Sequence, residues 1–498
     1  MIDRRRSFRT EPSAIVIRAI ATIACIAIST PAFASYCVYV GKNLTANGSV
    51  FLGGYGDEPS SHWLEIVLAR TFAPGTMTRV GVTDRANYPG MMSEIPQVER
   101  TAKYITMNYS EYAGFPAPLT NGGLNEHGVA ARDVWSTSRS ELRDMTPSPQ
   151  TGGPNYSDLA RIAMERAHTA RQAVEIVGEL IDRHGFSTYG GNSHLFADAD
   201  EGWVFINFAG GQGLWAAERL GPDDIRVSRP GYIHEFPVDF DSDPDYMASD
   251  NFISFAIERG WYDPEAGEPF NVTEVYGQDE RPGEPTPELI PKNHLGVHYI
   301  EDQLRNLGHK VTLEDMIHIV RMGAVTHDSA GYGQVAELRD VAHPELALLW
   351  VAATTPETAP FIPFRIGVTD VPAELKYHRY LSSGQARDAY VDEEVRGLES
   401  TRFALRTYKR LRYLMEEHEE KFLPEVTEAL VAFEGRLIAE QTAVERTALK
   451  LFEAGVPELA RRYLTYYSGN EALDGMRLGD ALADSIEART KAIYGIRQ

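Results

Sequence analysis

Cys37 is the residue with the clearest capacity for chemistry, because the sequence before it has the form of an export signal. Four arginines lie within residues 4–9, an apolar stretch runs from 19 to 28, and Ala32-Phe33-Ala34 offers the small side chains that a signal peptidase reads. The other cysteine, Cys25, lies inside the apolar stretch and would leave with it. The exported chain would then keep a single thiol and could not form an internal disulfide.

A cysteine at a new N-terminus carries its own base. The free α-amino group titrates near pH ~7.7–8.0, close enough to neutrality to accept the thiol proton. Such a pair defines a hydrolase with an N-terminal nucleophile. Cleavage after Ala34 leaves Ser35-Tyr36 in front of Cys37, so we expect these two residues to be removed in a second step, which could be autocatalytic. The alternative is a buried structural cysteine near the start of a strand.

Two further residues are candidates for the same chemistry. Asp57 ends a glycine-rich stretch that begins at Gly53, and a hairpin would return it to the Cys37 amine, where a carboxylate would stabilise the ammonium. Asn125 lies in the segment 121–129 and could donate an amide proton to a tetrahedral oxyanion. The alternatives are ordinary turn residues in both places, since Asp and Asn are common in glycine-rich turns.

The motifs for metals and cofactors are incomplete. His294 and His298 have the spacing of zinc ligands on a helix, but Gly296 lies between them and no His-Glu-x-x-His occurs. The acidic run 239–250 has Pro244 where a calcium loop requires glycine. The segment 211–216 follows a strand as a dinucleotide fingerprint would, but it fits a hairpin better. We therefore expect no metal and no cofactor.

Charge and hydropathy limit the partners. The chain has 498 residues and a formal net charge of −23, and loss of the arginine-rich leader would make the charge more negative. So acidic a chain is not expected to bind nucleic acid or an anionic membrane. Beyond the leader, no apolar run approaches the ~20 residues of a membrane span. We expect an exported protein, periplasmic or secreted, and Arg5-Arg6-Ser7-Phe8 resembles a twin-arginine signal for export in the folded state.

The first half of the chain alternates strand and helix patterns. Asn47-Gly48 between apolar runs predicts a hairpin that places Cys37 at the first residue of a strand. Further strands are expected at 103–109, 127–136, 194–198 and 202–208. Helices are expected at 157–171, with Ser157 as the N-cap, and at 173–184. This mixture predicts an α+β or layered fold.

The second half contains a polar excursion at 239–291, with one helix near 249–259, and strands at 346–353 and 361–368. From residue 373 the pattern changes to long charged helices, for example 385–421, 425–452 and 456–467. We therefore expect a signal peptide at 1–34, a short propeptide at 35–36, a catalytic domain at 37–372 and a helical region at 373–498. The helical region could pack on the catalytic domain or form a homo-oligomer contact.

Together these segments resemble a known family, the cysteine N-terminal-nucleophile dipeptidases of the dipeptidase A group. The resemblance covers about residues 37–372 and rests on the number and order of short matching pieces rather than on any one of them. They are Cys37-Val38-Tyr39-Val40-Gly41-Lys42, Asn47-Gly48-Ser49, Gly56-Asp57, Glu94-Ile95-Pro96-Gln97, Asn125-Glu126-His127, Trp203-Val204-Phe205, Trp215-Ala216-Ala217, Pro222-Asp223-Asp224, Ser249-Asp250-Asn251, Leu349-Trp350-Val351 and Pro363-Phe364.

The resemblance implies an αββα four-layer sandwich and metal-free hydrolysis of dipeptides or short peptides through a thioester on Cys37. An amidase or acylase of the same fold acting on N-acyl amino acids, and a non-enzymatic binding or scaffold protein that keeps Ser35-Tyr36, remain the alternatives. Two positions depart from the family. Many relatives have an arginine where this chain has Gly54, and an asparagine in the turn where it has Ser228-Arg229-Pro230-Gly231. The resemblance therefore leaves the contacts to the substrate carboxylate and to the oxyanion unassigned, and the substrates could differ from simple dipeptides.

Overall fold

The computed structural model describes residues 35–57, 62–110, 114–228, 233–277, 297–322, 330–376 and 402–495. The predicted leader, residues 1–34, and His294 lie outside these ranges, as does the side chain of His298. Residues Ala34–Gln498 form one compact unit. The boundary expected near residue 372 therefore separates two kinds of sequence within that unit rather than two separately packed bodies.

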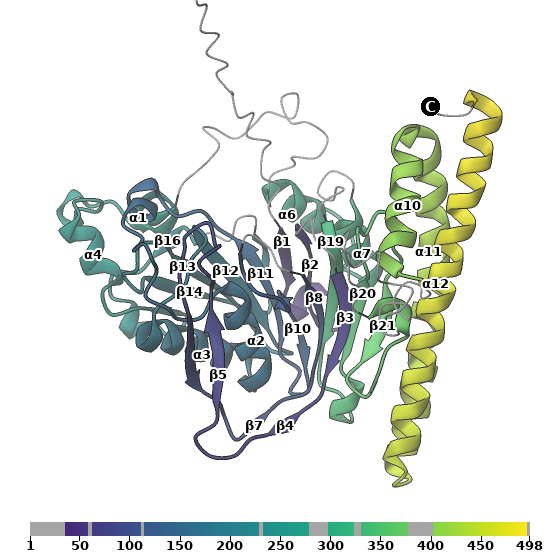
Figure 1. The fold of residues 1–498 in the computed structure, drawn as a ribbon, viewed down its shortest axis with the longest axis horizontal. Helices are drawn as coiled ribbons and strands as arrows, with labels where there is room; N and C mark the ends of the chain where they lie inside the picture. The colour runs from purple at the N-terminus through teal and green to yellow at the C-terminus, as the bar shows by residue number, and fades with distance from the viewer. Residues whose placement is uncertain are drawn as a thin grey trace, which may run out of the picture. The chain divides into compact units, whose positions relative to one another are not determined.

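One sheet of six strands carries Cys37 (Figure 1). All of its strand pairs are antiparallel. The predicted hairpin is confirmed as its first two strands in sequence, and Asn47 Oδ1 accepts a hydrogen bond from the Ser49 amide at the turn (3.1 Å). In spatial order the strands are β15 (Ile225–Ser228), β1 (Tyr36–Val40), β2 (Val50–Asp57), β19 (Ala330–Leu338), β20 (Leu348–Ala352) and β21 (Ile362–Arg365).

A second sheet of nine strands lies against the first. Side-chain hydrogen bonds cross from one sheet to the other, among them those from Tyr39 to the Leu220 carbonyl, from Gln334 to the Ala131 carbonyl, and from Arg132 to the Tyr332 hydroxyl. Its strands in order are β17 (Tyr246–Ala248), β14 (Trp215–Leu220), β13 (Gly202–Phe208), β12 (Gly191–Ala197), β11 (Ala130–Trp135), β10 (Gly122–Asn125), β8 (Tyr104–Tyr109) and β3 (His62–Val67), with β9 (Leu119–Thr120) paired to β8.

Two helices cover the outer face of the nine-stranded sheet. These are α2 (Tyr156–Arg166) and α3 (Ala170–His184), and they bury apolar side chains such as Ile162 and Val177 against Phe196, Trp203 and Phe205. The expected helix start at Ser157 is two residues late, because the Asn155 side chain forms the capping box with Asp158. The helix also ends at Arg166 rather than running to 171.

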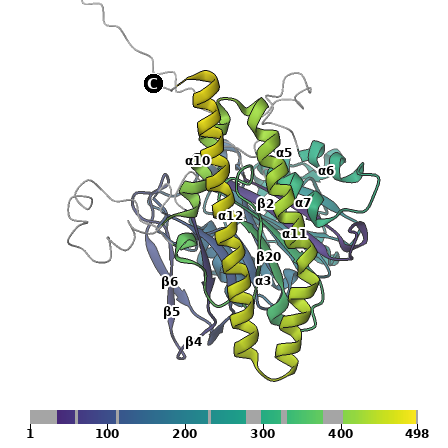
Figure 2. The ribbon, with the colours of Figure 1, turned by 90° about the vertical axis from the view of Figure 1, so that its right-hand side faces the viewer.

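Helices from later in the chain cover the outer face of the six-stranded sheet. They include α6 (Val297–Arg305), α7 (Leu313–Arg321), α11 (Glu419–Glu453) and α12 (Pro457–Tyr494), and Figure 2 shows α11 and α12 lying across the strands. α10 (Ala404–Glu416) packs against α12. The structure is therefore mixed α and β, with two antiparallel sheets and a helical C-terminal region.

Buried ion pairs join the helical region to the six-stranded sheet and its helices. Arg321 of α7 donates to both carboxylate oxygens of Glu434 on α11, with an Nη1–Oε2 distance of 2.8 Å. The amide of Phe361 also donates to Glu434 (2.7 Å), and Arg412 of α10 pairs with Glu357 (2.6 Å). In addition, apolar side chains of α10, α11 and α12 belong to the same hydrophobic core as those of the sheet.

The remaining elements are short. The segment expected as a polar excursion contains α4 (Phe252–Glu258) and α5 (Val272–Tyr276), and the expected hairpin after residue 208 is confirmed by the pairing of Asn207 with Trp215. The others are α1 (Ser140–Asp144) and the paired strands β4 (Arg70–Thr71) with β7 (Arg100–Thr101), β5 (Met77–Gly81) with β6 (Met92–Pro96), and β16 (Glu235–Phe236) with β18 (Phe270–Asn271).

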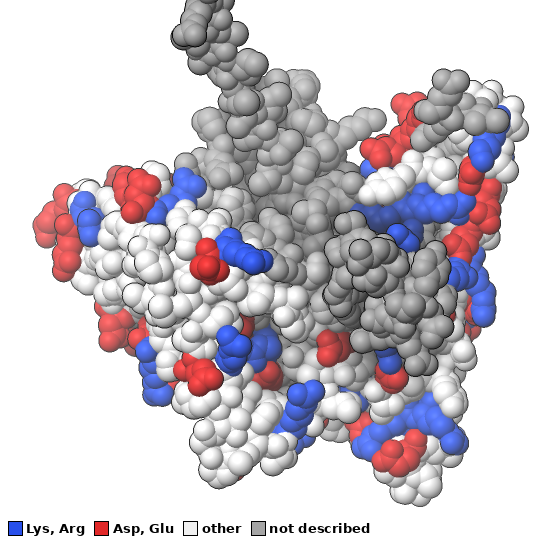
Figure 3. All heavy atoms as spheres, in the orientation of Figure 1, with Lys and Arg blue, Asp and Glu red and all other residues white. Residues whose placement is uncertain are grey.

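The described surface carries charges of both signs. Figure 3 shows basic and acidic side chains interspersed along the edge formed by α10 and α12. Several are ion pairs between helices, such as Arg410 with Glu487 (2.6 Å) and Arg489 with Glu425 (2.7 Å). Within the described ranges, no helix combines the length and the hydropathy that crossing a bilayer requires.

Candidate active site

Cys37 is the second residue of β1 and is fully buried. Side chains alternate along a strand. Tyr36 faces outward, where its hydroxyl donates to the Ile319 carbonyl of α7 (2.8 Å), and Tyr39 faces the second sheet, where it donates to the Leu220 carbonyl. Cys37 has the parity of Tyr39, so its thiol points into the space between the two sheets.

Two residues flank Cys37 on the neighbouring strands. Gly54 of β2 and Ser228 of β15 are its register partners. Directly opposite residues of an antiparallel pair share a face, with Cβ atoms about 4.5–5.5 Å apart. The Ser228 hydroxyl therefore lies beside the thiol on the inner face, and it is buried with no hydrogen-bond partner among the residues that the structure describes.

Gly54 leaves room on the other side of Cys37. A Cβ atom at this position would lie 2.1 Å from the Tyr36 carbonyl oxygen and 3.0 Å from the Cys37 Cα. A side chain at this position would therefore collide with the backbone of β1 while Tyr36 is attached.

A buried guanidinium reaches the same space from the second sheet. Arg132 of β11 is fully buried, donates from Nη1 to the Tyr332 hydroxyl, and lies with its Cζ 4.6 Å from the centre of the Tyr332 ring. Tyr332 of β19 pairs with Gly56 of β2, next to Gly54 on the same face. Arg132 therefore supplies a positive charge close to the thiol.

The surroundings oppose ionisation of the thiol while residues 35 and 36 are attached. Burial raises the pKa of the Cys37 thiol above its ordinary value, and the positive charge of Arg132 acts in the opposite direction. In this form the α-amino nitrogen of Cys37 is a peptide nitrogen and cannot act as a base. Burial therefore favours the neutral thiol in this form.

Asp57 is the last residue of β2, and its backbone is in register with Ala330 of β19. It follows Gly54 on the strand that pairs with β1, as the predicted hairpin requires. Its side chain lies outside what the structure describes, so the role expected for this carboxylate stays a prediction.

Asn125 does not contribute to this site. Its Nδ2 donates to the Met164 and Ala167 carbonyls of the α2 segment, and its Oδ1 accepts from the amides of His127 and Val129. It therefore faces the helices, away from the space between the sheets. The oxyanion role expected for Asn125 disagrees with these contacts, because both of its amide protons are already donated.

The segment before Asn125 is a strand and not the expected turn. Gly122 and Gly123 belong to β10 and have φ values of 125° and 127°. A Cβ atom at Gly123 would lie 1.9 Å from the Ile105 carbonyl oxygen of β8. The glycines therefore serve the close approach of neighbouring strands, which resembles a turn signal in sequence.

Groups that could hold a metal ion are absent from the described ranges. In the acidic run at 239–250, Asp239 accepts a hydrogen bond from the Ser242 hydroxyl and Asp243 accepts one from the Asp245 amide (3.0 Å). These are local turn contacts, as expected from the sequence.

Sequence reasoning missed Arg132 and Ser228. Both lie on strands that are distant from Cys37 along the chain, and only the sheet topology brings them together. A signal was available for Ser228, since the Pro222-Asp223-Asp224 turn precedes a short apolar strand that could pair with β1. A lone arginine in an apolar strand was the corresponding signal for Arg132.

Comparisons with known proteins identify the family of this chain. Residues 37–284, about half of the chain, match peptidase family C69, and the match begins at Cys37 itself. A probable dipeptidase of Salmonella dublin is 34% identical over 166 residues, which are 33% of this chain and 36% of that protein. Dipeptidase A of Lactobacillus helveticus is 28% identical over 158 residues, which are 31% and 32% of the two chains.

A probable dipeptidase B of Streptococcus pyogenes serotype M3 is 24% identical over 269 residues, 53% of this chain and 50% of that protein. The alignments thus span between about a third and a half of the length of these curated relatives. They agree with the family match and with the resemblance seen in the sequence. The chain belongs to peptidase family C69.

Proposed function

We propose that this protein is an exported cysteine-type dipeptidase in which Cys37, freed of Ser35-Tyr36, is an N-terminal nucleophile. The observation that carries the proposal is the position of Cys37. It is the residue at which the family match begins, and it lies at the start of a strand with its thiol between two sheets. Peptides are the proposed substrates because the matched relatives are named dipeptidases.

The proposed reaction needs no group beyond the chain and water. The Cys37 amine takes the thiol proton, and the thiolate attacks the scissile carbonyl to form a carbon–sulfur bond. The resulting ammonium returns the proton to the leaving amine as the carbon–nitrogen bond breaks. Water then attacks the thioester, its proton passes to the amine, and the acid leaves as the thiol is restored. A carboxylate at Asp57 would stabilise the ammonium.

Ser228 is the donor that we propose for the oxyanion in place of Asn125. Its hydroxyl lies beside the thiol on the inner face of the sheet and has an uncommitted proton. A donor fixed in a buried site stabilises the developing negative charge of the tetrahedral intermediate strongly, because little water competes with it.

Arg132 supports the choice of a substrate with a free carboxylate. Its guanidinium lies close enough to Cys37 to lower the thiol pKa, in a site where Gly54 and Gly56 contribute no side chain. A guanidinium is the group best suited to bind a carboxylate. We therefore propose that Arg132 takes the role that the relatives assign to an arginine at position 54.

The layered arrangement supports a sandwich of the N-terminal-nucleophile type. Two antiparallel sheets pack face to face, α2 and α3 cover one outer face, and α7 and α11 cover the other. Export, by a twin-arginine route in particular, is proposed from the leader sequence alone.

An intact-mass measurement on active, purified protein tests the proposal. The expected N-terminus is Cys37, and the Cys37→Ala variant should fold but lack turnover of dipeptides, while chelators should leave the wild-type activity unchanged. Active protein that begins at Ser35 would contradict the mechanism, and inactive protein that begins there would support a binding or scaffold role.

A substrate panel tests the specificity. Dipeptides with a free carboxylate should be cleaved faster than the same dipeptides capped as amides, because only the former can pair with Arg132. Faster cleavage of N-acyl amino acids than of dipeptides would favour the acylase alternative instead.

A further inference from the structure

The helix α11 presents an uncharged apolar face to solvent. α11 lies in front of the sheet in Figure 2, so its outward face is turned to the viewer. Val431 on this face is 54% exposed. Between Glu428 and Arg446, the exposed positions opposite the buried side of the helix are Val431, Ala432, Gly435, Ala439, Thr442 and Ala443. The outward face of a surface helix normally carries charged and polar side chains, yet this one has none for about 18 Å along the helix.

The charged residues of α11 are divided in a way that matches this face. From Glu425 to Arg446, all but two have an ion-pair partner in the chain. The paired residues are Glu425 with Arg489, Glu434 with Arg321, Arg436 with Glu440 and Glu471, and Glu445 with Arg365. The two exceptions, Glu428 and Arg446, have no such partner among the residues that the structure describes. They lie at the two ends of the uncharged face.

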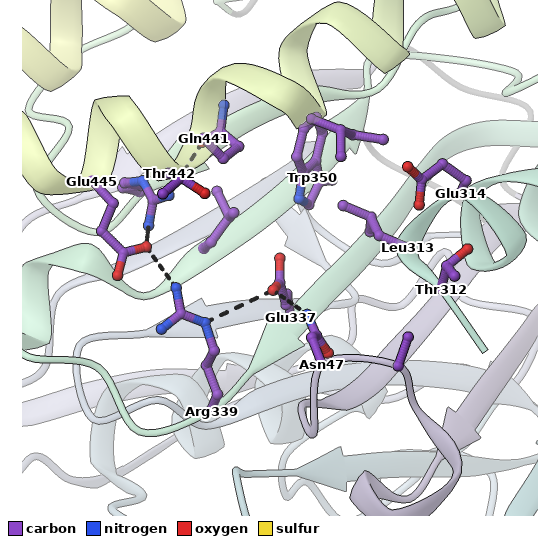
Figure 4. A pocket seen from close by; sticks show the side chains of 14 residues that line it. Asn47, Thr312, Leu313, Glu314, Glu337, Arg339, Trp350, Gln441, Thr442 and Glu445 are labelled. Atoms are coloured by element: carbon purple, nitrogen blue, oxygen red, sulfur yellow. Dashed lines mark hydrogen bonds and ion pairs between the residues drawn. The ribbon is translucent and has the colours of Figure 1, made fainter. Parts of the chain in front are cut away.

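The neighbours Glu445 and Arg446 show the difference clearly. Figure 4 shows Glu445 turned toward Arg339 and Arg365, in the cavity of about 290 Å³ between α7 and α11. Its charge is therefore used within the chain. Arg446 is exposed on the outward side of the helix, where its charge is available to another molecule.

The uncharged face and its two end charges are complementary to themselves. In an antiparallel pair of α11 helices centred on position 437, exposed residues of one copy meet exposed residues of the other. The opposite residues are Glu428 and Arg446, Val431 and Ala443, Ala432 and Thr442, and Gly435 and Ala439. A two-fold axis makes each of these contacts twice, so both Glu428 side chains face an arginine. The small residues at the centre allow the helix axes to approach to about 8 Å.

We propose that this face binds a second copy of the chain, and that the protein forms a two-fold dimer through antiparallel α11 helices. Opposite charges at equal distances from the centre are what a self-complementary contact requires. In a parallel pair, by contrast, Glu428 would face Glu428 and Arg446 would face Arg446. The contact is at the low end of specific interfaces in size, so we expect a dissociation constant of about 1–100 µM.

This dimer does not depend on the proposed peptidase activity, because α11 covers the face of the sheet opposite to the Cys37 thiol. Sedimentation velocity of the purified protein between about 1 and 100 µM tests it, and the wild type should change from one to two chains per particle over this range.

Glu428→Arg and Arg446→Glu should each weaken the dimer by about tenfold or more, because each puts like charges opposite each other twice. Charge reversal is needed, since a neutral residue at position 428 would remove only an exposed ion pair, which contributes little. Both positions are exposed, so circular dichroism of the variants should match the wild type.

An equimolar mixture of the Glu428→Arg and Arg446→Glu chains should form dimers that neither variant forms alone. In the mixed pair, both end contacts again join a positive and a negative side chain. Ala439→Trp, which puts a bulky side chain at the centre of the face, should remain a single chain. Glu258→Arg is the control, at an exposed position of α4, which Figure 1 shows at the opposite end of the molecule, and it should dimerise as wild type.

The proposal is overturned if the wild type remains a single chain up to about 100 µM. Wild-type dimerisation in either charge-reversed variant or in Ala439→Trp would also overturn it, as would a mixture of the two charge-reversed variants that does not restore the dimer.

Discussion

Ser228 and Cys37 lie directly opposite each other on β15 and β1, and this pairing is the basis of the oxyanion role that we propose for Ser228. A hydroxyl in this position needs no rearrangement to face the reacting carbonyl. Asn125, by contrast, is committed to the α2 backbone. The position opposite Cys37 in the strand register therefore identifies the candidate oxyanion donor, whereas the local motif around Asn125 does not.

Ser228→Ala should lower kcat for dipeptides by about 10²–10³-fold with little change in KM, the usual effect of losing one oxyanion donor. Steady-state kinetics of the mature protein measure this. Ser254→Ala, at an exposed position of α4, is the matched control and should behave as wild type. An unchanged kcat in Ser228→Ala would remove Ser228 from the mechanism.

The β1–β2 pair depends on the two residues that we propose are removed. Gly54 lies so close to the Tyr36 carbonyl that β1 and β2 can pair only if the residue at position 54 has no side chain. Once Tyr36 is removed, that oxygen is gone and the nearest remaining atom is the Cys37 Cα at 3.0 Å. The requirement for glycine is thus much stricter in the precursor than in the mature chain.

Gly54→Ala should therefore destabilise the precursor by at least about 1–3 kcal/mol, the range for overpacking a buried site. A chain expressed to begin at Cys37 should tolerate the same change better. Chemical unfolding of both forms, with Cys37→Ala to keep the precursor intact, gives the comparison. Gly435→Ala on α11, where an added Cβ meets nothing within 4 Å, is the control. Equal losses in both forms would refute the argument.

The sequence allowed prediction of elements with strong local signals. The β1–β2 hairpin follows from Asn47-Gly48 and β13 from its apolar run, and both are confirmed. The strand β10 could not be predicted, because Gly122-Gly123 has the composition of a turn and only the neighbouring strands explain it. Arg132 joins the site through sheet packing, which no local pattern encodes.

At the scale of the whole molecule, the C-terminal helices are held to the sheet by charges inside the core. Arg321 and Glu434 are 5% and 3% exposed, and the pair joins α7 to α11. Since α7 also accepts the hydroxyl of Tyr36 through Ile319, the helical region supports the layer that covers β1. This contact gives the tail a structural role within the protein.

Glu434→Gln should lower the free energy of unfolding by about 3–5 kcal/mol, because it removes the negative charge that pairs with the buried Arg321 guanidinium. Denaturant unfolding followed by circular dichroism measures the loss. Glu428→Gln on the same helix is exposed and should change stability by less than about 0.5 kcal/mol. A loss no larger than in the control would show that the pair does not hold the tail.

The stability of the whole fold should also depend on pH through His194. Burial lowers the pKa of His194 from 6.5 to about 3, and its contacts with the Tyr156 carbonyl (3.2 Å) and the Asn192 amide (3.3 Å) suit the neutral ring. Below pH 6.5 the unfolded chain binds a proton that the folded chain does not, so stability falls as the pH decreases toward 3.

His194→Asn should remove a slope of up to about 1.4 kcal/mol per pH unit from the unfolding free energy in that interval. Urea unfolding at several pH values between 4 and 7 tests this. His318→Asn, at an exposed position of α7, should retain the wild-type slope. The same slope in His194→Asn as in wild type would exclude His194 as its source.

The peptide bond between Tyr36 and Cys37 lies in an inner strand of the six-stranded sheet, with β15 on one side of this strand and β2 on the other. A separate protease must draw its target into its own cleft as an extended segment and bind its main chain there. In the folded protein both residues are fully buried and their strand is already paired on both edges. Another enzyme could therefore remove Ser35-Tyr36 only before β1 pairs with β15 and β2. After that, only groups of the same molecule can make the cut, and a folded, untrimmed copy should resist any protease added to it.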